Sequence, residues 1–130
     1  MQHANITVKA ANGTTDVVFV AKSPFAGDRS PATWAVDADS VYRDQRTVAT
    51  HASRPHGTKK ARRDFIDILV PVVRTIDGNP VRVDTIPFRF ESTVGNSVTD
   101  TEANEATARA VNLLASVLMK SAIAAKENFS

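Results

Sequence analysis

The spacing of the apolar residues changes once along this 130-residue chain, at Thr99. Before Thr99, apolar and polar side chains mostly alternate, and a period of two predicts β-strands. After it, apolar residues recur at helical spacing and form one stripe. Strands followed by helices predict an α+β fold, in which two C-terminal helices cover one face of an antiparallel sheet. We expect one domain over residues 1–130.

Turn residues divide the first part of the chain into strands. The first 22 residues predict a β-hairpin, because Asn12-Gly13 is a dipeptide that tolerates positive φ at both positions of a type I′ turn. A short strand with the only tryptophan, Trp34, comes next. Further strands are expected at 46–53, 59–75 and 81–92, with turns at 54–58 and 77–80.

The strand expected at 59–75 has one strongly apolar face and one mixed face. Period two separates the two sets, which are Ile66, Ile68, Val70 and Val72 on the apolar face and Phe65, Asp67, Leu69 and Pro71 on the mixed face. This contrast is typical of an antiparallel sheet covered on one side. Pro71 cannot donate a ladder hydrogen bond, so it predicts a bulge or a sheet edge.

The helical part begins with a capping box. The Thr99 hydroxyl can accept a hydrogen bond from the Glu102 amide, and the Glu102 carboxylate can reach back to Thr99. Acidic residues in the first turn favour the helix N-terminus. The helix can continue to about Lys126, and a bend near Ser116 would divide it in two.

Composition excludes several classes of protein. There is no cysteine, so disulfides, thiolate nucleophiles and zinc–thiolate sites are excluded. No apolar run has the length of about 18–20 residues that spans a membrane, and the first residues do not read as a signal peptide. We expect no membrane association.

The net positive charge of the chain comes from one segment. Residues 43–63 carry a net charge of +6, while residues 1–42 carry −1 and residues 64–130 carry −3. A local basic patch on a nearly neutral chain indicates a polyanionic partner. The alternative is a solvated basic loop.

No set of residues predicts catalysis. The sequence has no phosphate-binding loop, no dinucleotide-binding glycine motif and no nucleophile elbow. His51 and His56 could form a metal pair, but no carboxylate is close to them in sequence. Asp64 and Asp67 are expected on opposite faces of one strand, so they form no carboxylate pair. We expect no enzyme activity, no cofactor and no bound metal ion.

The basic segment predicts an RNA-binding surface. The uncovered sheet face is expected to carry Thr47, His51, Ser53, Arg63 and Phe65, and the adjacent turn would extend it. Basic side chains can neutralise phosphates, and Phe65 can stack on an unpaired base. Singly, Phe65 has a simpler explanation as a subunit contact and His51 as a cross-strand residue. The full candidate set is Arg46, Thr47, His51, Ser53, Arg54, Lys59, Lys60, Arg62, Arg63 and Phe65.

The apolar helix stripe predicts self-association. One sheet layer of this length is too small to cover it, so we expect a second copy of the chain to complete the fold. The residues expected at this dimer interface are Ala106, Ala110, Leu113, Leu114, Val117 and Leu118.

The arrangement resembles the coat proteins of the small single-stranded RNA bacteriophages, the leviviral family. The resemblance covers nearly the whole chain and rests on the order of its elements. Four stretches also resemble family members: residues 12–17, the Trp34 strand, residues 85–88 and residues 113–116.

This resemblance implies an intertwined dimer with one continuous sheet and an icosahedral shell around a single-stranded RNA genome. It implies a location in the virion, with assembly in the cytoplasm of the bacterial host. The inner sheet face would also bind an RNA hairpin and repress translation. By strand position, this RNA-facing surface would hold Thr47, His51, Ser53, Lys59, Arg63 and Phe65.

Two features depart from the family pattern. The stretch 75–81 is much shorter than the hairpin that family members carry between their last strands. The last strand also lacks the family's stacking tyrosine, since the only tyrosine is Tyr42. A dimeric cellular RNA-binding module that forms no shell is the alternative function.

Overall fold

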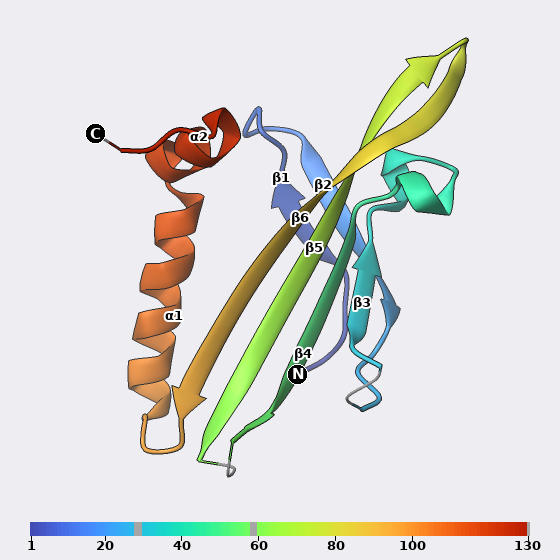
Figure 1. Cartoon of the computed structure of the whole chain (residues 1–130). Helices are drawn as coiled ribbons and strands as arrows, with labels where there is room; N and C mark the ends of the chain where they lie inside the picture. Colours follow the sequence, from blue (N-terminus) through green and yellow to red (C-terminus); the bar gives the residue numbers. More distant parts are fainter. Residues whose placement is uncertain (28–29, 58–59, 130) are drawn as a thin grey trace. The chain divides into compact units, whose positions relative to one another are not determined.

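The computed structural model describes residues 1–27, 30–57 and 60–129. By internal contacts the chain divides into two compact units, Met1–Thr93 and Val94–Ser130. The first unit is built on an antiparallel sheet whose six strands follow one another in sequence order (Figure 1). The strands are β1 (Ile6–Lys9), β2 (Asp16–Ser23), β3 (Ala32–Ala35), β4 (Val48–His56), β5 (Ala61–Ile76) and β6 (Asn79–Gly95). The expected fold class, an antiparallel sheet followed by two C-terminal helices, is confirmed.

The N-terminal hairpin forms as predicted, but its turn does not. Gly13 has a φ of +75°, whereas Asn12 keeps a negative φ, so the type I′ prediction is wrong. Asn12 acts through its side chain instead, and its Oδ1 accepts hydrogen bonds from the amides of Thr14 (3.0 Å) and Thr15 (2.9 Å). The side-chain acceptor replaces the backbone geometry that the dipeptide pattern predicts.

A type I′ turn does occur, between β5 and β6. Asp77 and Gly78 have φ values of +51° and +79°, which is the pattern that joins two strands through a two-residue loop. The stretch 75–81 is short because the strands continue almost to this turn. In Figure 1 the β5–β6 hairpin extends beyond the end of β4. Pro71 lies two positions past the last β4 pair, Val48 with Leu69, so the predicted edge position is correct.

The predicted turn at 54–58 lies too early in the chain. β4 continues through Arg54 and Pro55 to His56, which pairs with Ala61. Pro55 fits into this strand opposite Arg62. Thr58 and Lys59 lie outside the described residues.

The second unit contains two helices, α1 (Asp100–Ala115) and α2 (Val117–Ala125). The Thr99 hydroxyl accepts a hydrogen bond from the Glu102 amide, as the capping box predicts. Ser116 breaks the helix with extended backbone angles, donates its hydroxyl to the Leu113 carbonyl and caps α2 through the Met119 amide. The predicted bend is therefore present, and it measures 55°.

No single helix in the described residues is long and apolar enough to cross a membrane; the bent pair α1 and α2 together passes that test on length and composition alone.

Very little of the described chain is buried. Ala32, Val36 and Ala52 are its buried apolar residues, and all three are small. No residue of α1 or α2 is buried. Large apolar side chains remain at the surface on the sheet and on both helices, among them Ile66, Leu69, Ile86, Leu113 and Leu118.

Candidate nucleic-acid interface

The register between β4 and β5 decides which side chains share a sheet face. Ala52 lies opposite Phe65, Arg54 opposite Arg63 and Thr50 opposite Asp67. Directly opposed residues of an antiparallel pair point to the same face, and faces alternate along each strand. We call this surface the Phe65 face: Thr50, Ala52, Arg54, Arg63, Phe65 and Asp67, joined by Arg89 and Glu91 of β6, which contact them.

The same register corrects the predicted grouping of RNA-binding residues. His51 lies opposite Ile66, and Ser53 lies opposite Asp64, so both point away from Phe65 and Arg63. Thr47 precedes β4 by one residue and has the same parity as His51. The predicted common face for Thr47, His51, Ser53, Arg63 and Phe65 is therefore wrong. The predicted pairing of β4 with β5 differs from the observed register by one residue. A shift of one residue turns every side chain of a strand to the other face.

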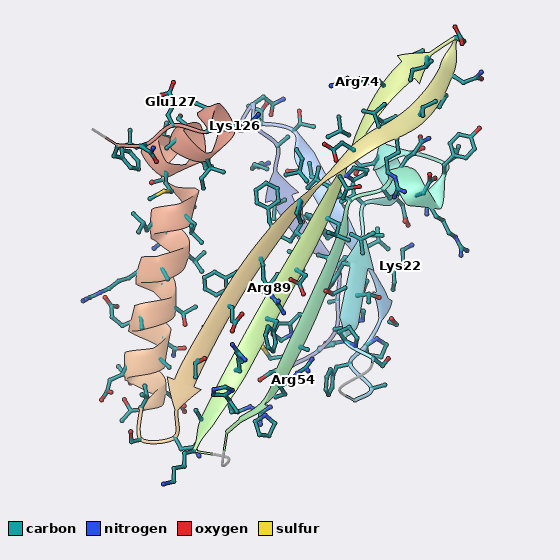
Figure 2. All side chains as sticks on the ribbon, viewed as in Figure 1. Lys22, Arg54, Arg74, Arg89, Lys126 and Glu127 are labelled. Atoms are coloured by element: carbon teal, nitrogen blue, oxygen red, sulfur yellow. The ribbon has the colours of Figure 1, made fainter. Side chains whose placement is uncertain are left out.

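Three arginines surround the Phe65 ring. The guanidinium carbons of Arg54, Arg63 and Arg89 lie 5.1, 5.2 and 4.8 Å from the ring centroid. These distances are within the range of cation–π attraction. Figure 2 shows Arg54 and Arg89 on β4 and β6, away from Arg74, which lies near the tip of the β5–β6 hairpin. The arrangement holds three cations around one half-buried aromatic ring.

Two carboxylates share the Phe65 face with these arginines. Asp67 Oδ1 lies 3.2 Å from Arg89 Nε. Glu91 forms an ion pair with Arg63 and lies 4.0 Å from Arg89 Nε through its other oxygen. Arg54 has no carboxylate partner among the described residues. The five charged side chains of this face therefore sum to +1.

The opposite face of β4 and β5 has its own polar contacts. His51 Nε2 lies 3.4 Å from Asp64 Oδ1. Arg62 donates hydrogen bonds to the hydroxyl and the carbonyl of Ser53, both at 3.2 Å. Three members of the predicted RNA-binding set, His51, Ser53 and Arg62, are thus engaged with neighbours on this face. Lys60 is exposed, and Lys59 is among the residues that are not described.

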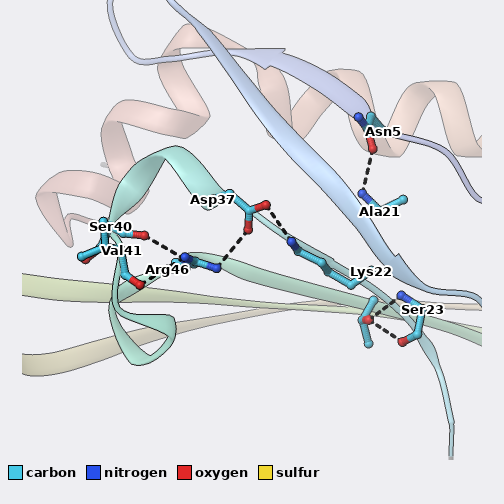
Figure 3. Close-up of polar contacts among 9 residues, drawn as sticks. Asn5, Ala21, Lys22, Ser23, Asp37, Ser40, Val41 and Arg46 are labelled. Atoms are coloured by element: carbon cyan, nitrogen blue, oxygen red, sulfur yellow. Dashed lines mark hydrogen bonds and ion pairs between the residues drawn. The ribbon is translucent and has the colours of Figure 1, made fainter.

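Arg46, another predicted RNA contact, stabilises the loop between β3 and β4. This loop contains two short 3₁₀ helices, η1 (Asp37–Asp39) and η2 (Arg43–Gln45). Arg46 donates to the carbonyls of Ser40 (2.8 Å) and Val41 (3.2 Å) and forms a 3.2 Å ion pair with Asp37 (Figure 3). Its guanidinium is committed to the fold of the loop.

Asp37 joins Arg46 to strand β2. Its second oxygen lies 2.6 Å from the Lys22 ammonium. The hydrogen bond from Lys22 is the largest cause and lowers the pKa of the Asp37 carboxyl; burial opposes it, and the charges of Lys22 and Arg46 lower the pKa further. Gln45 is buried beside this network and donates to the Pro80 carbonyl at 3.1 Å, which links the loop to β6.

Arg89 and Glu91 were not among the residues predicted for this site. Their strand alternation was visible in the sequence, with Thr85, Pro87, Arg89 and Glu91 at period two. The basic segment ends at Arg63, however, so the distribution of charge along the sequence does not indicate a binding residue on β6. Only the pairing of β6 beside β5 brings Arg89 to Phe65.

A shallow apolar hollow of about 560 Å³ adjoins Arg89 on the Phe65 face. Val48, Leu69 and Pro87 line it, and Asp67 and Arg89 supply charged groups at its side. The described residues contain no cluster of three or more side chains that could hold a metal ion. The described part of this face thus combines ion pairs, one aromatic ring beside three arginines and an apolar hollow.

The Asp37 network gives a testable dependence of stability on pH. A carboxyl with a lowered pKa in the folded state stabilises the fold above its unfolded pKa and loses that effect as pH falls through the folded pKa. We expect Asp37→Asn to lower the unfolding temperature at pH 7. The difference from the native chain should shrink as pH falls below the ordinary carboxyl value of 3.8.

The matched control for this experiment is Asp16→Asn. Among the described residues, Asp16 forms an ion pair only with Lys9, in an exposed contact between β1 and β2. Exposed single pairs contribute little to stability. Thermal unfolding followed by circular dichroism compares the three proteins. Equal unfolding temperatures for Asp37→Asn and the native chain at pH 7 would contradict a stabilising role for this network.

Comparison with known proteins matches the fold and not the sequence. No protein-family model matches the chain, and no curated protein matches it. Among solved structures, a virus-like particle of Beihai levi-like virus 21 superposes with a TM-score of 0.84 at 17% identity, covering 100% of this chain and 99% of the other. A virus-like particle of bacteriophage NT-214 also gives a TM-score of 0.84 at 17% identity, with 100% of both chains covered.

The protein capsid of bacteriophage GA is a third similar structure. It superposes with a TM-score of 0.75 at 19% identity over 98% of this chain and 97% of the other. All three matches run over essentially the whole length of both chains. The chain therefore has the leviviral coat-protein fold.

Proposed function

We propose that this chain is the coat subunit of a single-stranded RNA bacteriophage. It dimerises, and the dimers assemble into an icosahedral shell that packages RNA in the bacterial host cytoplasm. Its role is structural and involves no catalysis or cofactor. The observation that carries the proposal is the superposition of the whole chain on chains of virus-like particles and of a phage capsid.

The exposed helices support the dimer. Leu113, Leu114, Val117 and Leu118 have 57%, 43%, 77% and 68% of their surface exposed. Ala106 and Ala110 lie beside Leu113 along one hollowed face of α1. Burying each large apolar side chain is worth about 1.5–3 kcal/mol. A second copy that covered this stripe would supply the apolar burial that the described chain lacks.

The last strand supports a continuous sheet across the dimer. β6 stands at the end of the strand order, so its outer edge has no neighbouring strand in the part of the chain that the structure describes. This edge is up to 17 residues long. Long unpaired edges are templates for pairing with another strand. Antiparallel pairing of β6 with its copy would satisfy both edges at once.

The Phe65 face supports RNA binding. Of the predicted set, Arg54, Arg63 and Phe65 share this face, and Arg89 adds a third cation. Arginines beside a half-buried aromatic ring and an apolar hollow suit a phosphate backbone with unpaired bases. We infer that this face binds the genome and an RNA hairpin through which the protein represses translation.

Particle formation is the direct test of the proposal. Expression of the full chain in bacteria should yield uniform icosahedral particles in electron micrographs, with an absorbance spectrum dominated by RNA. Nuclease should degrade that RNA only after the particles are dissociated. Recovery of a small RNA-binding dimer without particles would favour a cellular RNA-binding module instead.

The helix stripe can be tested with one substitution. Leu114→Asp would place an unpaired charge in the proposed interface, which should cost several kcal/mol and abolish the soluble dimer. Leu114→Met keeps an apolar side chain of similar volume and should preserve it. Light scattering coupled to gel filtration gives the mass of each protein. A Leu114→Asp protein that remains dimeric would place the interface elsewhere.

Substitutions on the two sheet faces should have different effects on RNA binding. Phe65→Leu should weaken binding to single-stranded RNA by about 1 kcal/mol or more, because stacking is lost. Arg54→Ala should weaken it and reduce the slope of log affinity against log salt by about 0.7. His51→Ala, on the opposite face, should leave affinity unchanged. The reverse pattern in fluorescence anisotropy would assign RNA binding to the His51 face.

A further inference from the structure

The three arginines around Phe65 differ in their partners. Arg63 and Arg89 are paired with Glu91 and Asp67, whereas Arg54 has no carboxylate partner among the described residues. Glu91 reaches two of the arginines, one through each of its oxygens. Two of the arginines proposed to bind RNA phosphates are thus already paired with carboxylates of the protein itself.

These ion pairs are accessible to solvent. The Arg89 and Asp67 side chains are 56% and 44% exposed, and Arg63 and Glu91 are 37% and 31% exposed. Exposed ion pairs contribute at most about 1 kcal/mol. An RNA phosphate can therefore replace either carboxylate as the partner of an arginine, and the displaced carboxylate then faces the phosphate as a like charge.

Attraction between an arginine and RNA phosphate is independent of sequence. With both carboxylates present, the charged residues of this face sum to +1; without them, the sum would be +3. The carboxylates thus weaken the sequence-independent attraction between this face and the phosphates of any RNA. Stacking on Phe65 and contacts in the adjacent hollow then contribute a larger share of the binding free energy.

We propose that Asp67 and Glu91 are specificity-determining residues of the RNA surface. They act as internal counterions that restrain sequence-independent binding, so that an RNA must supply correctly placed bases as well as phosphates. This inference rests on the proposed RNA-binding function of the Phe65 face. It assigns to the two carboxylates a role beyond cross-strand pairing.

The test compares dimeric native protein with Asp67→Asn and Glu91→Gln. Both substitutions keep side-chain size and remove the negative charge. The probe is a fluorescein-labelled oligouridylate, which presents phosphates and bases but no folded hairpin. Each variant should bind it several-fold more tightly at low salt. The salt slope should become steeper by about 0.7 for each arginine released.

The matched control is Glu105→Gln on α1. Glu105 forms an exposed ion pair with Arg109 at 2.8 Å, away from any residue of the Phe65 face in the sequence and outside the sheet. The control removes the same charge from the whole protein and should change neither affinity nor slope. Thermal unfolding of all variants tests whether the carboxylates serve stability alone.

The counterion role of Asp67 and Glu91 and RNA binding by the Phe65 face can fail separately in this experiment. If the native protein binds the oligouridylate through Arg54 but Asp67→Asn and Glu91→Gln bind with unchanged or lower affinity and only unfold earlier, the counterion role is wrong. The proposed RNA surface then stands. If neither the native protein nor either variant binds the oligouridylate, the proposed RNA-binding function of this face fails, and the counterion role fails with it.

Discussion

A nearly absent internal core is the constraint on which the rest of this structure depends. The buried apolar residues of the described chain are two alanines and one valine, while leucines and isoleucines lie exposed on the sheet and on both helices. Apolar burial is the main favourable term in folding. A chain that leaves this much apolar surface open is suited to assembly, and we propose that a second copy covers it. The second copy would then cover both the open edge of β6 and the exposed apolar stripe of α1 and α2.

The sheet that provides these edges also presents the proposed RNA surface. Long strands allow β4, β5 and β6 to bring Arg54, Arg63 and Arg89 to one ring, Phe65, from three separate parts of the chain. The loop between β3 and β4 is fixed by ion pairs of Asp37 with Arg46 and Lys22. Basic residues of the same segment, 43–63, therefore have different roles. Arg46 stabilises a loop, Arg62 contacts Ser53 on one face, and Arg63 lies beside Phe65 on the other.

Sequence reasoning recovered the fold class and most elements because periodicity and capping are local. The change of spacing at Thr99, the break at Ser116 and the edge position of Pro71 all follow from single residues and their neighbours. The face of each β4 side chain could not be recovered in the same way, since it depends on where the strand ends. Placing the turn at 54–58 instead of after His56 reversed the assignment of His51 and Ser53. Arg89 was missed because its neighbours in space lie on other strands.

The central claim is that this chain completes its core by association with a copy of itself. Equilibrium unfolding in urea at several protein concentrations tests it most directly, because an obligate dimer has no stable folded monomer. We predict that the unfolding midpoint rises with protein concentration and that dissociation and unfolding coincide. A midpoint independent of concentration, with a folded species of 14.0 kDa in sedimentation, would contradict the account.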